Sequence, residues 1–183
     1  MTTTTDIIPA TDWVAGTWTI DPSHSEVGFT VRHLVSKVRG QFETFEGTLT
    51  TGETLEETRA NASVDLNSVN TRDAGRDGHL RSADFFDVEK SGPMTFRSTS
   101  FDGSTAVGEL TIKGVTKQVE LDVEFLGTDT DPYGNTKIGF EASTEINRKD
   151  FGVSFNGVVD GGKVLVGDKV QIHLAIEAVL DQA

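Results

Sequence analysis

Alternation of apolar and polar residues runs through most of this chain and limits the folds that it can adopt. The segment "KQVELDVEF" at 117–125 shows the pattern clearly, because every second side chain is apolar: Val119, Leu121, Val123 and Phe125. Successive side chains of a β-strand point to opposite faces of the sheet, so this spacing predicts an antiparallel strand with one buried and one solvated face. A helix would need apolar residues three and four positions apart.

The same alternation recurs often enough to predict an all-β domain. Besides 117–125, predicted strands lie at 17–21, 25–33, 39–50, 58–66, 94–101, 105–113, 137–146 and 169–180. Short turn segments such as "DG" at 102–103 separate most of them, so strands that are neighbours in sequence are expected to pair. About eight strands close an antiparallel up-and-down β-barrel, whose interior is filled by side chains or holds one small ligand. A two-sheet sandwich is the alternative.

The segment at 70–93 interrupts the pattern. It has no alternation and is too long for a hairpin, and a short helix is predicted near 75–84. A long connection in an antiparallel domain is often functional, so this one is a candidate for a lid or for one wall of a pocket.

The periodic region indicates a single domain at 17–183, preceded by a polar tail at 1–16 that we expect to be flexible. The first residues lack the basic start and the apolar run of a secretory signal, which favours a cytoplasmic protein. No apolar stretch approaches the roughly 20 residues of a membrane helix, so stable membrane insertion is not expected.

Charge and cysteine content exclude several classes of function. The chain has 29 acidic and 16 basic residues, a formal net charge of -13 that would repel nucleic acid and anionic membrane surfaces. It has no cysteine, so neither a disulfide nor a thiolate nucleophile is available.

The histidines are the scarcest reactive groups of the sequence. His33 follows Val27, Phe29 and Val31 on the apolar side of its predicted strand, whereas His173 lies on the polar side of another strand. His33 is therefore predicted to point inward at a barrel mouth, where it meets a ligand or caps the strand end. The four histidines do not have the spacing of a metal site, and we expect neither a metal nor a cofactor.

Basic residues gather in or beside the irregular segments of this acidic chain. The members of this set are Arg72, Arg76, Arg81, Lys90, Arg148 and Lys149. One explanation is an anionic ligand. The other is local pairing with neighbouring aspartates, and the sequence leaves both explanations open.

Five ordered segments together resemble the YceI-like family of lipocalin-like bacterial proteins. They are "WTIDPSHSEVGFTVRHL", "VRGQFETFEGTL", "RDGHLRSADFFDVEKSGPMTFRS", "GELTIKGVTKQVELDV" and "GFEASTEINRKDFGV". The resemblance runs from about residue 17 to residue 180 and implies an elongated antiparallel barrel. In this family a long apolar tunnel holds a polyisoprenoid chain, with its polar head near the mouth.

The resemblance also implies site residues. The ligand head group would meet His33, Arg72, Asp73 and His79, with Arg148 as a neighbour. The wall of the tunnel would be the inward register of the strands: Val27, Phe29, Val31, Phe42, Val64, Met94, Phe96, Leu110, Leu121, Val123, Ile138, Phe140, Ile172 and Leu174.

Three functional hypotheses follow. The first is a carrier or reservoir for an isoprenoid or other long-chain lipid, such as a polyprenyl phosphate or a quinone, and not an enzyme. The second is an enzyme acting on such a lipid, with His33 and His79 as acid and base beside Arg72. The third is a packed barrel without ligand, acting in protein interaction or stress response. A homodimer is compatible with all three.

Overall fold

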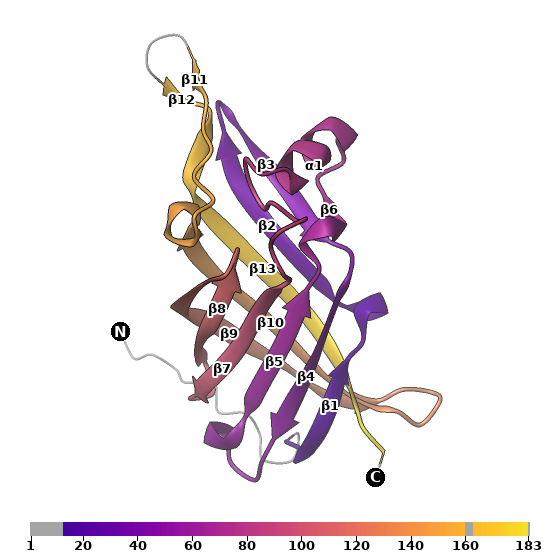
Figure 1. Cartoon of the computed structure of the whole chain (residues 1–183). Coiled ribbons are helices and arrows are strands. Elements are labelled where there is room, and N and C mark those ends of the chain that lie inside the picture. Colours follow the sequence, from indigo (N-terminus) through magenta and orange to yellow (C-terminus); the bar gives the residue numbers. More distant parts are fainter. Residues whose placement is uncertain (1–12, 160–162, 183) are drawn as a thin grey trace.

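The computed structural model describes residues 13–159 and 163–182, whose main sheet is an elongated antiparallel barrel (Figure 1). Its strands are β1 (Gly16–Ile20), β2 (Glu26–His33), β3 (Ser36–Phe42), β4 (Phe45–Thr51), β5 (Arg59–Val64), β6 (Val69–Asn70), β7 (Met94–Phe101), β8 (Thr105–Ile112), β9 (Val115–Thr130), β10 (Thr136–Asn147) and β13 (Val166–Leu180). A separate hairpin contains β11 (Val158–Val159) and β12 (Lys163–Val164). The helical elements are α1 (Ala74–Arg81) and the 3-10 turns η1 (Pro22–His24), η2 (Leu55–Glu57), η3 (Leu66–Ser68) and η4 (Arg148–Phe151).

Eight strands close the barrel in the order β1-β4-β5-β7-β8-β9-β10-β13, because β1 pairs with both β4 and β13. The strands β2, β3 and β6 continue β1, β4 and β5 toward one end. Accordingly, β13 pairs with β1 through residues 178–180 and with β2 through residues 166–175. The predicted all-β, eight-stranded barrel with one short helix in its long connection is confirmed for the described residues, and the sandwich alternative is wrong.

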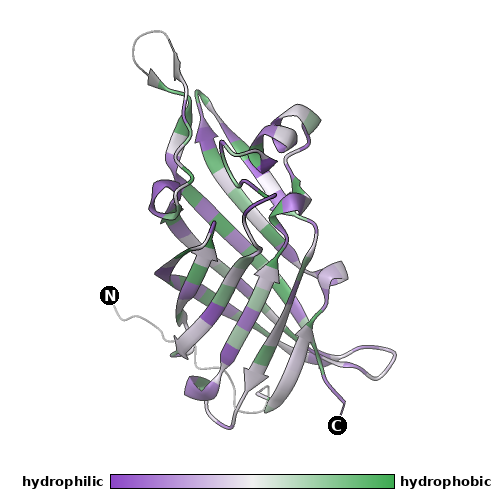
Figure 2. Ribbon diagram, viewed as in Figure 1, coloured by the Kyte–Doolittle hydropathy of each residue, from purple (hydrophilic) through white to green (hydrophobic). Residues whose placement is uncertain are grey.

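The alternation seen in the sequence is the alternation of the barrel wall, as the colours along each strand show (Figure 2). In β2 the side chains of Val27 and Phe29 face the interior, whereas Arg32 is exposed. Phe42 and Phe45 are three positions apart and would point to opposite faces of one continuous strand. The chain bends at residues 43–44, between β3 and β4, so both side chains point inward and are buried.

The connection at 71–93 covers the place where β6 and β7 do not pair. β6 is two residues long and pairs only with β3, while β7 begins at Met94 and pairs with β5 and β8. Asp73 is the N-cap of helix α1, and its side chain accepts a hydrogen bond of 2.8 Å from the backbone N of Arg76. Past α1, Phe85 and Phe86 pack against the interior side chains of the barrel.

Trp18 forms the centre of the interior at the barrel end that lies away from β2, β3 and helix α1. It is 0% exposed and packs with Ile138, Phe140 and Ala178, and its Nε1 donates a 2.9 Å hydrogen bond to Thr51 Oγ1. Trp13 lies beside this cluster, edge-on to Phe125, so ordered packing begins before the expected domain start at residue 17. The expected flexible tail otherwise falls on residues 1–12, outside the described residues.

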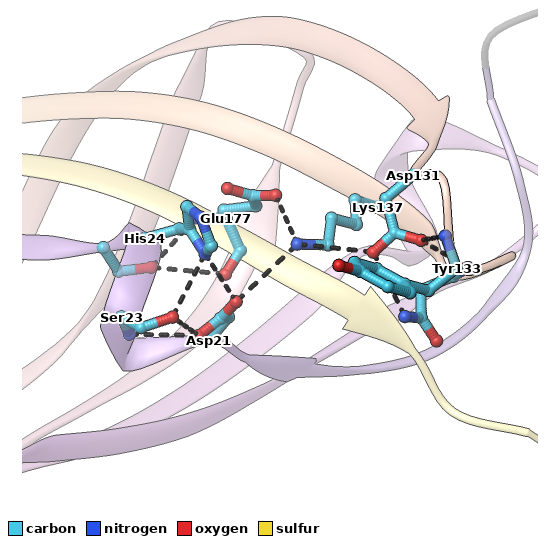
Figure 3. A network of polar contacts seen from close by, with 9 residues as sticks. Asp21, Ser23, His24, Asp131, Tyr133, Lys137 and Glu177 are labelled. Atoms are coloured by element: carbon cyan, nitrogen blue, oxygen red, sulfur yellow. Dashed lines mark hydrogen bonds and ion pairs between the residues drawn. The ribbon is translucent and has the colours of Figure 1, made fainter.

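Outside the same end, Lys137 joins three chain segments (Figure 3). Its Nζ lies 3.0 Å from Glu177 Oε1 on β13, 3.7 Å from Asp21 Oδ2 beside η1, and 3.8 Å from Asp131 Oδ2 in the β9–β10 turn. The hydrogen bond to Glu177 and the three carboxylates raise the pKa of Lys137. This network holds the turns on the outside of the barrel end.

No described helix is long and apolar enough to cross a membrane.

Candidate ligand-binding site

A cavity of about 190 Å³ lies at the barrel end formed by β2, β3, α1 and η4. Its wall is almost entirely apolar. Six of the predicted tunnel residues line it, and they are Val27, Phe29, Val31, Phe42, Met94 and Ile172. Apolar cavities of this size stay dry and hold hydrocarbon; one of about 150 Å³ binds benzene. This space therefore suits a hydrocarbon segment.

A glycine allows one side of the cavity to form. Gly40 pairs with Phe29 across the β2–β3 ladder, and a Cβ atom on Gly40 would lie only 2.4 Å from Phe29 Cζ and 2.9 Å from Thr71 Cγ2. The Phe29 ring thus leans over the backbone of β3 and packs against Phe42, with ring centroids 5.6 Å apart. Glycine in a strand interior is typical of such a close approach.

Aromatic side chains from the irregular segments form the opposite side. The rings of His79, Phe85 and Phe155 contact one another, with centroid distances of 5.1 Å, 4.9 Å and 5.2 Å. Two of them come from the 71–93 connection, and the third follows η4. Sequence alternation carries no signal for this contribution because these residues are not in strands.

Four ionisable side chains give the wall a polar region: His33, Arg76, His79 and Arg148. His79 is 44% exposed and its Nε2 lies 2.8 Å from Asp84 Oδ2, so it marks a place where the wall meets solvent. The His33 ring has no hydrogen-bond or ion-pair partner within the described part of the chain. A ligand head group is one partner that it would accept.

Arg76 also lies on the wall. In the sequence it is one of the clustered basic residues but not one of the predicted head-group residues. Its Nε and Nη2 donate to Thr71 Oγ1 at 2.8 Å and to Thr71 O at 2.7 Å. Thr71 in turn donates from its N and its hydroxyl to the buried carboxylate of Asp77. The guanidinium is thereby held in place, while Nη1 has no hydrogen bond to the described residues and is available to an anion.

Arg148, the predicted neighbour of the head group, is held by backbone carbonyls, and its contact with a head group stays a prediction. It is 5% exposed, and it donates three 2.8 Å hydrogen bonds to the carbonyl oxygens of Gly167, Val153 and Phe155. Burial lowers its pKa, and Asp168, 3.7 Å away, opposes that effect. The side chain lines the cavity, but its guanidinium donates to backbone carbonyl oxygens and so fixes the loop after η4.

The other predicted residues lie off this cavity. Arg72 and Asp73 are exposed at the start of α1, Arg72 with a φ of 66° and Asp73 as the N-cap. The remaining tunnel candidates point inward, but belong to the packed part of the interior or to its edges: Val64, Phe96, Leu110, Leu121, Val123, Ile138, Phe140 and Leu174. Their contact with a ligand stays a prediction. Within the described ranges, no three histidine or carboxylate side chains are grouped to hold a metal ion.

Comparison with known proteins agrees with this architecture. A UPF0312 protein of Staphylococcus aureus (strain MSSA476) is 37% identical over 166 residues, which cover 87% of this chain and 95% of the relative. The crystal structure of a Campylobacter jejuni YCEI protein superposes with a TM-score of 0.70 and 30% identity, covering 88% of this chain and 96% of the other. A polyisoprenoid binding domain from Saccharophagus degradans shares the fold, with a TM-score of 0.66, 14% identity and coverage of 92% and 100%.

The family model described as the YceI-like domain matches residues 18–178. This match covers most of the barrel, from Trp18 in β1 to Ala178 in β13. The resemblance expected from the five sequence segments is confirmed, and the chain belongs to the YceI-like family.

Proposed function

We propose that this protein binds a long-chain isoprenoid-type lipid in the barrel cavity, as a carrier or reservoir and not as an enzyme. The observation that carries the proposal is the apolar cavity whose wall includes His33, Arg76 and His79 as ionisable side chains, besides the backbone-bound Arg148. A hydrocarbon chain buried there gains about 25 cal/mol for each Å² of apolar surface removed from water. The comparisons support the proposal, since the domain from Saccharophagus degradans that shares this fold is described as a polyisoprenoid binding domain.

The size of the cavity limits how such a ligand enters. A volume of about 190 Å³ holds a segment somewhat larger than benzene, not an entire polyprenyl chain. A longer chain therefore extends out of the cavity or displaces side chains. The aromatic cluster of His79, Phe85 and Phe155 is the part of the wall best suited to move, because it belongs to connections and not to the hydrogen-bonded sheet.

The proposal is tested by native mass spectrometry of the purified protein, followed by solvent extraction and incubation with polyprenyl phosphates and quinones. A lipid bound one to one is the expected result. Replacing Ile172 on the cavity wall by Trp should abolish that complex by filling the space. The control is His173→Trp, one residue along β13 on the exposed face, which should bind as the wild type does.

Head-group recognition is tested separately with Arg76→Gln. Loss of a charged hydrogen bond is worth about 1.5–3 kcal/mol, or roughly tenfold or more in affinity. We expect this loss for a polyprenyl phosphate and little change for the alcohol of the same chain length. Equal weakening of both lipids would mean that Arg76 acts only through its contacts with Thr71.

A further inference from the structure

The tip of the β2–β3 hairpin is apolar where a turn is normally polar. Its two turn residues, Leu34 and Val35, are 40% and 100% exposed. Two-residue hairpin turns favour Asn-Gly and similar pairs, since they need a positive φ. Here Leu34 adopts a φ of 52°, a conformation that costs a branched side chain energy. The fold therefore gains nothing from leucine and valine at these positions.

The outer face of the same hairpin carries three cations without an anion. Arg32 and Lys37 lie directly opposite each other in the ladder, and Arg39 follows on the same face. All three are exposed, and none forms an ion pair with the described residues. No acidic residue occurs between Glu26 and Glu43. Like charges directly opposite each other destabilise a sheet, so this pair also works against the fold.

The neighbouring elements add apolar surface and little negative charge. Leu34 N donates to Leu165 O at 3.0 Å, which places the hairpin tip beside Val164 of β12, itself 57% exposed. The nearest carboxylate on β13, Asp168, is engaged by Lys149 at 3.3 Å and by Arg148 at 3.7 Å. The tip is therefore apolar at its end and basic on its outer face.

The inner face of the hairpin is part of the cavity. Val31, His33 and Val38 line it from the same two strands whose outer side chains are the cations. An object that touches the tip would thus lie next to the cavity. This continuity separates the tip from the other exposed apolar side chains, Leu126 and Tyr133, which lie in or after the part of β9 that pairs near the opposite end.

We propose that the β2–β3 tip docks onto an anionic lipid bilayer, with Leu34 and Val35 in the interfacial region and Arg32, Lys37 and Arg39 on the lipid phosphates. Docking places the cavity against the membrane, from which a lipid is loaded or to which it is delivered. This purpose rests on the proposed lipid binding, whereas the docking itself rests on the hairpin alone.

The net charge of -13 does not prevent such docking. Electrostatic interactions are screened over about 8 Å at physiological ionic strength. Along the hairpin strands, Glu26 and Glu43 are at least four residues from any of the three cations, or roughly 13 Å at strand rise, which is beyond that distance. Asp168 on β13 is nearer but is paired with Lys149 and Arg148. Each basic residue near an anionic bilayer strengthens binding by about fivefold. The whole-chain charge predicts repulsion, while the distribution of charge predicts one oriented contact.

Flotation with lipid vesicles tests the proposal. The full chain should float with vesicles of phosphatidylcholine and phosphatidylglycerol, less so as salt increases, and only weakly with phosphatidylcholine alone. The double variant R32Q/K37Q should bind at least tenfold more weakly. The variant L34N/V35G, which installs a favoured turn and so keeps the hairpin folded, should also lose binding. Matched controls away from the tip are R59Q/R97Q for charge and L126N for apolar exposure.

The outcomes separate docking from lipid binding. The docking proposal would be overturned if the wild-type protein did not float with anionic vesicles, or if the hairpin variants floated as the wild type does. Native mass spectrometry without vesicles should show the same bound lipid in all variants. Hairpin-dependent flotation of a protein that carries no lipid would support docking and defeat the proposed function instead.

Discussion

The two ends of the barrel use the same strands for opposite purposes. At the Trp18 end, Trp18 and Ala178 are 0% exposed and Ile138 is 1% exposed, so large and small side chains pack together in one buried cluster. At the other end, β2 and β13 continue with residues of the same apolar types, but a cavity of about 190 Å³ remains between them. The inward register of a strand therefore predicts an apolar wall without predicting whether the space behind it is filled.

The ends also differ in how their backbone is hydrogen-bonded. Ladders close the Trp18 end, from β1 through β13. At the cavity end the irregular backbone depends on side chains. Arg148 donates to four backbone carbonyls, and Asn156 Oδ1 accepts from the N atoms of Leu165 and Val166 at 3.0 Å and 2.9 Å. Buried backbone groups need partners, and outside a sheet specific side chains supply them. We therefore expect the closed end to contribute most of the stability, and the proposed ligand to bind at the end whose backbone is stabilised by individual side chains.

Substitution of Trp18 tests the filled end and should have the largest effect. Trp18→Ala removes a fully buried ring and its hydrogen bond to Thr51, which is expected to cost about 3–5 kcal/mol of the free energy of unfolding. Phe29→Ala, on the cavity wall, should cost less because Phe29 already borders empty space. Urea denaturation measures both. Equal losses would mean that the two ends are packed alike.

Arg148→Met tests whether the cavity end depends on one side chain. Four carbonyl oxygens lose a donor, three of them bound at 2.8 Å, and unsatisfied buried groups cost about 1–3 kcal/mol each, so we expect the free energy of unfolding to fall by at least about 3 kcal/mol. Arg148→Lys should recover only part of it, since an ammonium cannot reproduce the planar fork. Unchanged stability combined with weakened binding of polyprenyl phosphate would instead restore Arg148 as a head-group ligand.

Two glycines, one near each end of the barrel, allow the same Gly→Ala substitution to be compared at the two ends. Gly40→Ala places a Cβ against Phe29 and Thr71 and is expected to cost about 1–3 kcal/mol by overpacking, with a changed cavity. Gly139→Ala, in β10 near the Trp18 end, meets nothing closer than 3.5 Å and should be nearly neutral. Thermal unfolding with and without lipid measures the difference. Lipid-induced stabilisation unchanged in Gly40→Ala would show that Phe29 is not part of the binding wall.

Much of the fold could be predicted from the sequence because sheet alternation is a local property. The strands, the helix after Asp73 and the inward direction of Phe29 all follow from residues close in sequence. Whether the interior is filled or contains a cavity does not follow from local sequence, because the cavity depends on Phe85, Phe86 and Phe155, which reach it from irregular segments. Arg148 shows the same limit. Its position beside a loop suggests an anion or an aspartate, whereas backbone carbonyls five, seven and 19 residues along the chain accept its hydrogen bonds.

The smallest expected effect concerns the ion network outside the Trp18 end. The hydrogen bond from Ser23, followed by that from His24, lowers the pKa of Asp21 from 3.8 to about 2. A carboxylate whose pKa is lower in the folded than in the unfolded state stabilises the fold above about pH 4 and loses this contribution as the pH falls toward 2. Solvent screens the group, so Asp21→Asn should cost about 1 kcal/mol or less at neutral pH. Urea midpoints measured between neutral pH and pH 2 should fall less steeply in this variant than in the wild type. Parallel curves would place the acid sensitivity elsewhere and leave the network without a part in holding the closed end.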